Sequence, residues 1–117
     1  MSIRRVVPNL TTTDMDLMKD FYTRVIGPRI VMDHGWIVTL AAADRPDVQV
    51  SLMTHDATAP VVPSASIEVD DSSHQYRLAL AAGTEIVYPL TDEPRGGRRF
   101  FVRDPSGNVI NILSHRT

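Results

Sequence analysis

One pattern occurs twice in this sequence, and it restricts the possible fold more than any other feature. Each copy has a β-branched run, an aspartate that opens a helix-type stretch, and a glycine that ends it. From Asp14 to Gly27 is thirteen residues, and from Asp70 to Gly83 is also thirteen. Strand-type runs follow each glycine. The repeat predicts two copies of one strand-helix-strand-strand-strand module.

The first copy opens with the run 3–12, in which Pro8 marks an edge, a bulge or a crossing point, because proline cannot donate to a central strand ladder. Thr13-Asp14 provides a helix cap, and Gly27-Pro28 ends the helix. Strands are predicted at 29–32, 36–40 and 48–53, with a turn at 33–35, a polar loop at 44–47 and a linker at 56–63. Apolar residues at helical spacing predict one buried stripe on the helix: Met18, Phe21, Tyr22 and Val25.

The second copy closes with a hairpin. Strands are predicted at 65–69 and 85–90, around a helix that starts at 70–73. The runs 98–103 and 109–113 then flank the turn Asp104-Pro105-Ser106-Gly107-Asn108. Proline fixes φ at the first central position, and glycine supplies a positive φ where the chain reverses, so the loop is tight and well specified.

The composition is that of one globular domain. The 117 residues are 43% hydrophobic and 22% charged, which is enough for one core. A net charge of −2 does not favour nucleic acid or a membrane surface, and the absence of cysteine excludes disulfides and thiolate sites. No segment resembles a signal peptide, and no apolar stretch approaches the roughly 20 residues that span a bilayer. A cytoplasmic location is therefore predicted.

The predicted fold class is α+β, in a single domain of residues 1–117 with module one at 1–57 and module two at 62–117. Each module is expected to bury one face of its sheet under its own helix. The opposite, curved faces of the two sheets are expected to enclose a shared ligand-binding cup.

The closing motif Arg-Phe-Phe-Val-Arg-Asp-Pro-Ser-Gly-Asn, together with the duplicated module, resembles the vicinal oxygen chelate superfamily. This group contains glyoxalase I, extradiol dioxygenases, fosfomycin-modifying enzymes and bleomycin-binding resistance proteins. Phe21-Tyr22 after Asp14, and the segment 68–71, extend the resemblance over essentially the whole chain. The resemblance is closest to the metal-free, bleomycin-resistance-like branch, and it implies a homodimer, often with an exchanged module or strand. That branch commonly has Pro-Trp-Gly where this sequence has Pro94-Arg95-Gly96, which argues against bleomycin itself as the ligand.

The enzymes of this superfamily hold one divalent metal on inward-facing His, Gln and Glu side chains from both modules. Carried over to this sequence, those positions are Val7, a residue between Ser51 and Met53, Ser64 and Asn111. Valine has no donor atom, and neutral hydroxyl and amide oxygens compensate no charge, whereas a catalytic site needs about three anionic or imidazole ligands. We therefore expect neither a metal nor another cofactor.

Strand alternation and the resemblance together predict the residues that face a ligand. The arginines of the last hairpin, Arg95, Arg98, Arg99 and Arg103, can be read in two ways. They form either a solvated rim balanced by Asp92 and Glu93, or a site in which Arg99, Phe101 and Arg103 hold a planar or anionic ligand. Asn111 either contacts the ligand or bonds to a side chain of a neighbouring strand. The full predicted ligand-binding set is Val7, Asn9, Trp36, Ser51, Met53, Ser64, Ser66, Arg99, Phe101, Arg103 and Asn111.

Catalytic candidates are limited to two residues. Glu68 shares the inward parity of Ser64 and Ser66 and is the one carboxylate that we nominate as a base. His55 shares the parity of Ser51 and Met53 and is a candidate hydrogen-bonding or proton-relay group. The other histidines are predicted to be solvated: His34 in a turn, His74 early in a helix and His115 at a frayed C-terminus.

Three functions remain open from the sequence. The first is a metal-free protein that binds a small, partly apolar organic molecule and sequesters an antibiotic or a metabolite. The second is a lyase, isomerase or dioxygenase with a degenerate or displaced metal site. The third is a non-catalytic subunit with no ligand, in which the protein's own side chains fill the cup.

Overall fold

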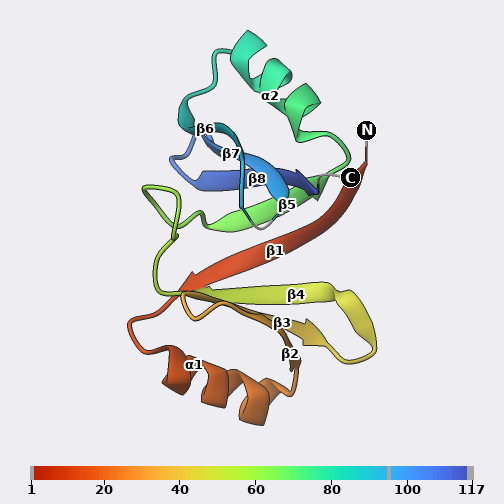
Figure 1. The fold of residues 1–117 in the computed structure, drawn as a ribbon, viewed down its shortest axis with the longest axis vertical. Coiled ribbons are helices and arrows are strands. Elements are labelled where there is room, and N and C mark those ends of the chain that lie inside the picture. Colours follow the sequence, from red (N-terminus) through yellow and green to blue (C-terminus); the bar gives the residue numbers. More distant parts are fainter. Residues whose placement is uncertain (1, 95, 116–117) are drawn as a thin grey trace. The chain divides into compact units, whose positions relative to one another are not determined.

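A computed structural model describes residues 2–94 and 96–115, which form eight strands, two α-helices and one π-helical turn (Figure 1). The elements are β1 (Ile3–Thr11), α1 (Met15–Phe21), η1 (Tyr22–Ile26), β2 (Arg29–Asp33), β3 (Ile37–Ala42), β4 (Arg45–Met53), β5 (Ala65–Val69), α2 (Ser72–Ala81), β6 (Ile86–Asp92), β7 (Gly97–Arg103) and β8 (Val109–His115). The predicted α+β class and the repeated order of one strand, one helix and three strands are confirmed. None of the helices described is long and apolar enough to cross a membrane.

The chain divides into two compact units, each built around one helix. The α1 unit is Val7–Val62, and the α2 unit is Met1–Val6 together with Pro63–Thr117. The division falls inside β1, between Val6 and Val7. The parallel pairing of β1 with β4 runs from Asn9 to Thr11. Pro8, which has no N–H to donate, therefore lies just outside that ladder, where β1 passes from one unit to the other.

In the α1 unit the strands are ordered β2-β3-β4-β1, and α1 packs on one face of this sheet. The Asp14 carboxylate caps α1 by accepting the N–H of Leu17 at 3.1 Å. The buried core under the helix is Val38, Leu40 and Leu52, against which Met15, Met18 and Tyr22 pack. These strand residues alternate along β3 and β4, as expected for a sheet with one covered face.

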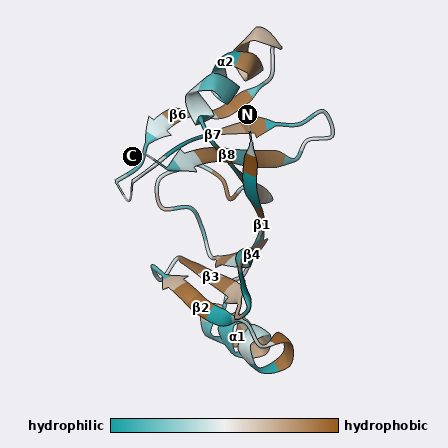
Figure 2. Cartoon of the chain, turned by 90° about the vertical axis from the view of Figure 1, so that its right-hand side faces the viewer, coloured by the Kyte–Doolittle hydropathy of each residue, from teal (hydrophilic) through white to brown (hydrophobic). Residues whose placement is uncertain are grey.

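The predicted helical stripe is wrong at two of its four residues. Met18 and Tyr22 contact the core, whereas Phe21 and Val25 are exposed. The α-helix changes to a π-helical turn at Tyr22, and this altered winding changes the direction of Val25. Phe21 lies in the α-helix before that turn, so the change of winding does not account for its exposure. Figure 2 shows hydrophobic and hydrophilic residues side by side along α1.

The polar loop predicted at 44–47 is also wrong, because β4 begins at Arg45. Ala42 pairs with Arg45 across a bulge, so the reversal takes only the two residues between them. The Gln49 side chain donates to the carbonyl of Pro46 at 2.8 Å and stabilises this first part of the strand. The predicted alternation of residues 48–53 is confirmed by Leu52 and Val50, which face the helix core.

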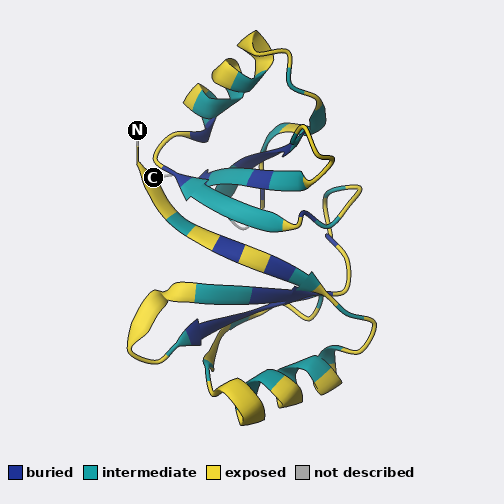
Figure 3. Ribbon diagram, turned by 180° about the vertical axis from the view of Figure 1, so that it is seen from behind, coloured by how far each residue is buried: buried dark blue, intermediate teal, exposed yellow. Residues whose placement is uncertain are grey.

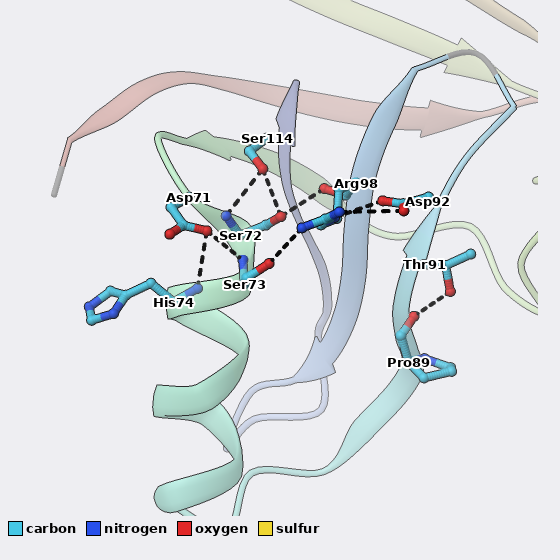
Figure 4. Close-up of polar contacts among 9 residues, drawn as sticks. All are labelled: Asp71, Ser72, Ser73, His74, Pro89, Thr91, Asp92, Arg98 and Ser114. Carbon is cyan, nitrogen blue, oxygen red and sulfur yellow. Dashed lines mark hydrogen bonds and ion pairs between the residues drawn. The ribbon is translucent and has the colours of Figure 1, made fainter. Parts of the chain in front are cut away.

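In the α2 unit the order is β5-β8-β7-β6, with the first residues of β1 beside β5. Asp71 caps α2 by accepting the N–H groups of Ser73 and His74, as Figure 4 shows. Ser72 is fully buried, and its hydroxyl lies 2.7 Å from that of Ser114 on β8. It also donates to the carbonyl of Arg98 on β7. The start of α2 is thereby fixed to two strands of its own sheet.

The hairpin of β7 and β8 closes on the predicted turn. One Asp104 carboxylate oxygen accepts the backbone N–H groups of Ser106 and Asn108, at 3.0 and 2.9 Å. The other accepts the side-chain amide of Asn108, and this hydrogen bond is the main cause that lowers the pKa of Asp104. Gly107 has φ +93°, the left-handed conformation that its position predicts.

Candidate functional site

The face of the α2-unit sheet turned away from α2 carries charged, polar and aromatic side chains. Strand register places polar and aromatic residues in rows that cross the four strands. Asn111 pairs with Ser66 and Phe101, and Phe101 pairs with Tyr88. The neighbouring row contains Glu68, Leu113, Arg99 and Thr91. The alternate residues, among them Phe100, face α2, where Tyr76 meets the Phe100 ring edge-on at 4.9 Å.

A buried ion pair lies on this face. Arg99 Nη2 is 3.1 Å from Glu93 Oε2, and the two side chains are only 4% and 3% exposed. Tyr88 donates its hydroxyl hydrogen to the other Glu93 oxygen at 2.9 Å. The Arg99 guanidinium also lies 4.9 Å from the centre of the Phe101 ring and 5.4 Å from that of Tyr88. The charge of Arg99 is therefore neutralised by a carboxylate and stabilised by two aromatic rings.

Asn111 is held by the adjacent strand and retains one acceptor. Its Nδ2 donates to Ser66 Oγ at 3.0 Å, so the predicted bond to a neighbouring strand is present. The residue is only 6% exposed, and its Oδ1 has no hydrogen-bond partner among the described residues. A buried acceptor in this state costs about 1–3 kcal/mol. The Asn111 amide is thus held in place through its nitrogen, and its oxygen is available to accept a hydrogen bond.

Glu68, the predicted candidate base, is paired with Arg5. Arg5 Nε lies 2.6 Å from Glu68 Oε1, and the side chains are 25% and 13% exposed. His115 Nε2 is 3.5 Å from the second carboxylate oxygen. His115 is the last residue of β8 and pairs with Gly97, so the prediction of a frayed end is wrong, although the side chain is largely exposed. The Glu68 carboxylate is therefore already engaged by the Arg5 guanidinium.

The α1 unit has a corresponding polar row on the sheet face turned away from α1. Ser51 pairs with Asn9 on one side and Thr39 on the other, and all three residues are buried. The hydroxyl groups of Thr39 and Ser51 are 3.0 Å apart. Met53 on β4 and Val7 on β1 are also buried. Figure 3 shows the buried stretches of these two strands in dark blue. The predicted residues Val7, Asn9, Ser51 and Met53 are therefore brought together within this unit.

Four further predicted residues lie outside these rows. The ring of Trp36 lies 6.0 Å from that of His55, whose Nδ1 is 2.9 Å from the hydroxyl of Thr54. Ser64 is exposed at the start of β5. Arg103 donates to Glu85 and to the turn carbonyl of Gly107, which holds it at the end of the hairpin. Arg95 lies outside the described residues.

Apart from the candidate base Glu68, five residues described on these faces were absent from the predicted ligand-binding set: Thr39, Tyr88, Thr91, Glu93 and Leu113. Thr39 is the single polar residue in an otherwise apolar strand, and this could have indicated from the sequence that it takes part in a polar site. Tyr88 and Glu93 lie opposite β7. The β6–β7 pairing has two register shifts, so counting alternate residues along β6 does not predict which β7 residues they face. Glu93 had been predicted only as a balancing acid of a solvated rim.

The donor atoms at the four transferred metal positions do not fit a catalytic divalent ion. Val7 supplies none, the Ser51 hydroxyl is bonded to Thr39, and Asn111 supplies one neutral amide oxygen. Within residues 2–94 and 96–115, no three His, Asp or Glu side chains gather as a metal site would require.

Comparison with known proteins agrees with this fold. The family profile described as Glyoxalase/Bleomycin resistance protein/Dioxygenase superfamily matches residues 3–112. The chain belongs to this superfamily. A bleomycin resistance protein of Klebsiella pneumoniae is 25% identical over 95% of this chain and 92% of its own length.

Solved structures of the superfamily show the same architecture. A superfamily member from Vibrio splendidus has a TM-score of 0.72 and 22% identity, over 94% of this chain and 97% of its own. Methylmalonyl-CoA epimerase from Mycobacterium tuberculosis has a TM-score of 0.73 and 16% identity, over 98% of this chain and 90% of its own. At these identities the likeness establishes the superfamily fold, and function has to be argued from the residues.

Proposed function

We propose that this superfamily member binds a small, partly apolar organic molecule without a metal ion, and that it sequesters an antibiotic or a metabolite. The observation that carries the proposal is the chemistry at the transferred metal positions. In the α1 unit Val7 and the Ser51 hydroxyl, and in the α2 unit the amide of Asn111, offer apolar contact or hydrogen bonds but no anionic charge. Such residues are suited to holding an uncharged organic group.

The likeness to a bleomycin resistance protein supports binding rather than turnover. An enzyme of the same superfamily is the rival, and Glu68 would be its base. The close pairing of Glu68 with Arg5 disfavours that role, since the carboxylate already has a strong cationic partner. If Glu68→Gln abolished a measured turnover of any substrate, the enzymatic alternative would replace the proposal.

Ligand titration tests the proposal directly. Bleomycin, other antibiotics and common metabolites are added singly, while thermal unfolding and the fluorescence of Trp36, the only tryptophan, are followed. A binder should raise the unfolding temperature, because it stabilises the folded state by mass action. The Trp36→Phe variant shows whether the fluorescence change arises at Trp36, because it should lose that signal. If no compound changes the unfolding temperature or the fluorescence, the result counts against the proposal and favours the ligand-free subunit.

Metal analysis gives a second expected outcome. We expect the purified protein to contain far less than one divalent metal per chain, since its donor atoms provide no charge compensation. Elemental analysis after dialysis against a metal-containing buffer measures this. About one ion per chain that is lost on Asn111→Ala would overturn the metal-free part of the proposal.

We also propose that the protein is a homodimer, as the resemblance implies. The α1 unit supports this with apolar side chains left exposed on α1 and η1, namely Leu17, Phe21, Val25 and Ile26. Several large apolar side chains exposed on one helical segment are typical of protein interfaces. Light scattering should then give twice the chain mass of 13.0 kDa. A mass of one chain at micromolar concentration would contradict it.

A further inference from the structure

We propose that the ligand is an electrically neutral, largely apolar molecule that donates one hydrogen bond, from an N–H or O–H group, to Oδ1 of Asn111. This inference rests on the proposed function and names the chemical class of the molecule that is bound. It depends on the charge balance of the α2-unit face and on the unfilled acceptor of Asn111.

The charge balance excludes an ion as the preferred ligand. Arg99 is paired with Glu93 at 3.1 Å, and both side chains are almost completely buried. Arg5 is paired with Glu68 at 2.6 Å. An anion would have to compete with Glu93 for Arg99, and a cation would have to compete with Arg99 or Arg5 for a carboxylate. Breaking a buried pair is strongly unfavourable, so a neutral molecule is favoured.

Asn111 specifies the polarity of the hydrogen bond that is left unmade at its own side chain. Its Nδ2 is already committed to Ser66 Oγ, which leaves the carbonyl oxygen of the amide for another group. That oxygen is buried and has no partner within residues 2–94 and 96–115. A group that fills it must donate. Native proteins satisfy the great majority of such buried atoms, so an unfilled one in a binding face indicates a ligand.

The immediate neighbours of Asn111 are suited to an apolar body. Phe101 stands opposite Asn111 in the register of β7 and β8, and its ring packs against Tyr88 with the centroids 5.2 Å apart. Leu113 is two residues along β8, on the same face. Ligand sites commonly combine such apolar side chains with a few polar groups that fix orientation. Here the amide of Asn111 supplies the orienting group.

A set of matched probes tests the inference. The probes are 2-naphthol, 2-methoxynaphthalene, 2-naphthoate and 2-naphthamidine, which share one ring system and differ in charge and in the donor. Binding is measured by thermal shift and by isothermal titration on the full chain. We expect 2-naphthol to bind about tenfold or more tightly than 2-methoxynaphthalene, the difference expected for one buried hydrogen bond. The anionic and cationic probes should bind more weakly than 2-naphthol.

The Asn111→Leu variant identifies the acceptor. It removes Oδ1 and approximately keeps the side-chain volume, so the preference for 2-naphthol over 2-methoxynaphthalene should disappear. Gln75→Leu removes another amide with an unpartnered buried oxygen, from α2, and should keep the preference, which makes it the matched control. If Asn111→Leu does not fold, Asn111→Asp is used, because it retains an acceptor at this position and should keep a preference for the donor probe.

The outcomes separate this inference from the proposed function. Tight binding of 2-naphthoate or 2-naphthamidine, or equal binding of the two neutral probes, would overturn the neutral-donor inference and leave the binding function in place. Binding of 2-naphthol that survives Asn111→Leu would overturn the assignment to Asn111. Failure of every probe and of the whole antibiotic and metabolite panel would count against the binding function itself.

Discussion

Replacing Glu93 with alanine is expected to lower the free energy of unfolding by about 3–5 kcal/mol, the range for breaking a buried ion pair. The substitution leaves the Arg99 guanidinium buried without its carboxylate, although Phe101 and Tyr88 still flank it. It also removes the acceptor of the Tyr88 hydroxyl. Denaturant unfolding, with the slope compared between variant and parent, measures the loss.

Two further variants show whether burial is the cause. Glu85→Ala breaks the pair between Arg103 and Glu85, whose carboxylate side chain is 62% exposed, and it should cost no more than about 1 kcal/mol. The double change Glu93→Leu with Arg99→Met removes both charges together. It should be less destabilising than Glu93→Ala, because no buried charge is left without a partner. Equal costs for Glu93→Ala and Glu85→Ala would show that the Arg99 pair is solvated in solution.

The fold could be predicted from the sequence because its signals are local. Aspartate caps, glycine ends and the Asp-Pro-Ser-Gly-Asn turn each depend on one or two neighbouring residues. The same dependence on local signals explains the errors. The helical stripe failed at Val25, within the π-helical turn that begins at Tyr22, and the loop at 44–47 failed where a bulge lets β4 begin at Arg45. Neither irregularity has a signal in apolar spacing.

The candidate site was less predictable because it depends on cross-strand register. Alternation placed Arg99, Phe101 and Asn111 on their face, and these positions follow from the tight hairpin alone. The partner of Arg99 did not follow, since Glu93 reaches it from beyond the bulges of β6. That partner changes the expected chemistry, because a paired Arg99 no longer favours an anion. The alternation along the strands thus predicted on which face these side chains lie. It did not predict that the charge of Arg99 is neutralised by Glu93.

The two adjacent phenylalanines of β7 provide the last large effect, since they lie on opposite faces of one sheet. Both are fully buried, so Phe100→Ala and Phe101→Ala should each lower the free energy of unfolding by about 3–5 kcal/mol. Phe100 packs against Tyr76 of α2, whereas Phe101 packs against Tyr88 and Arg99 on the proposed ligand face. The stability costs should therefore be similar and the binding effects different.

Titration with 2-naphthol is the measurement that distinguishes the two positions. Phe101→Ala should weaken binding, because it removes apolar contact beside Asn111 and loosens the guanidinium that the ring covers. Phe100→Ala should leave the affinity near that of the parent at temperatures where both variants are folded. If either alanine variant is unfolded, the milder pair Phe100→Leu and Phe101→Leu gives the same comparison. Equal losses of affinity at the two positions would mean that binding follows overall stability, and that the face turned away from α2 holds no ligand.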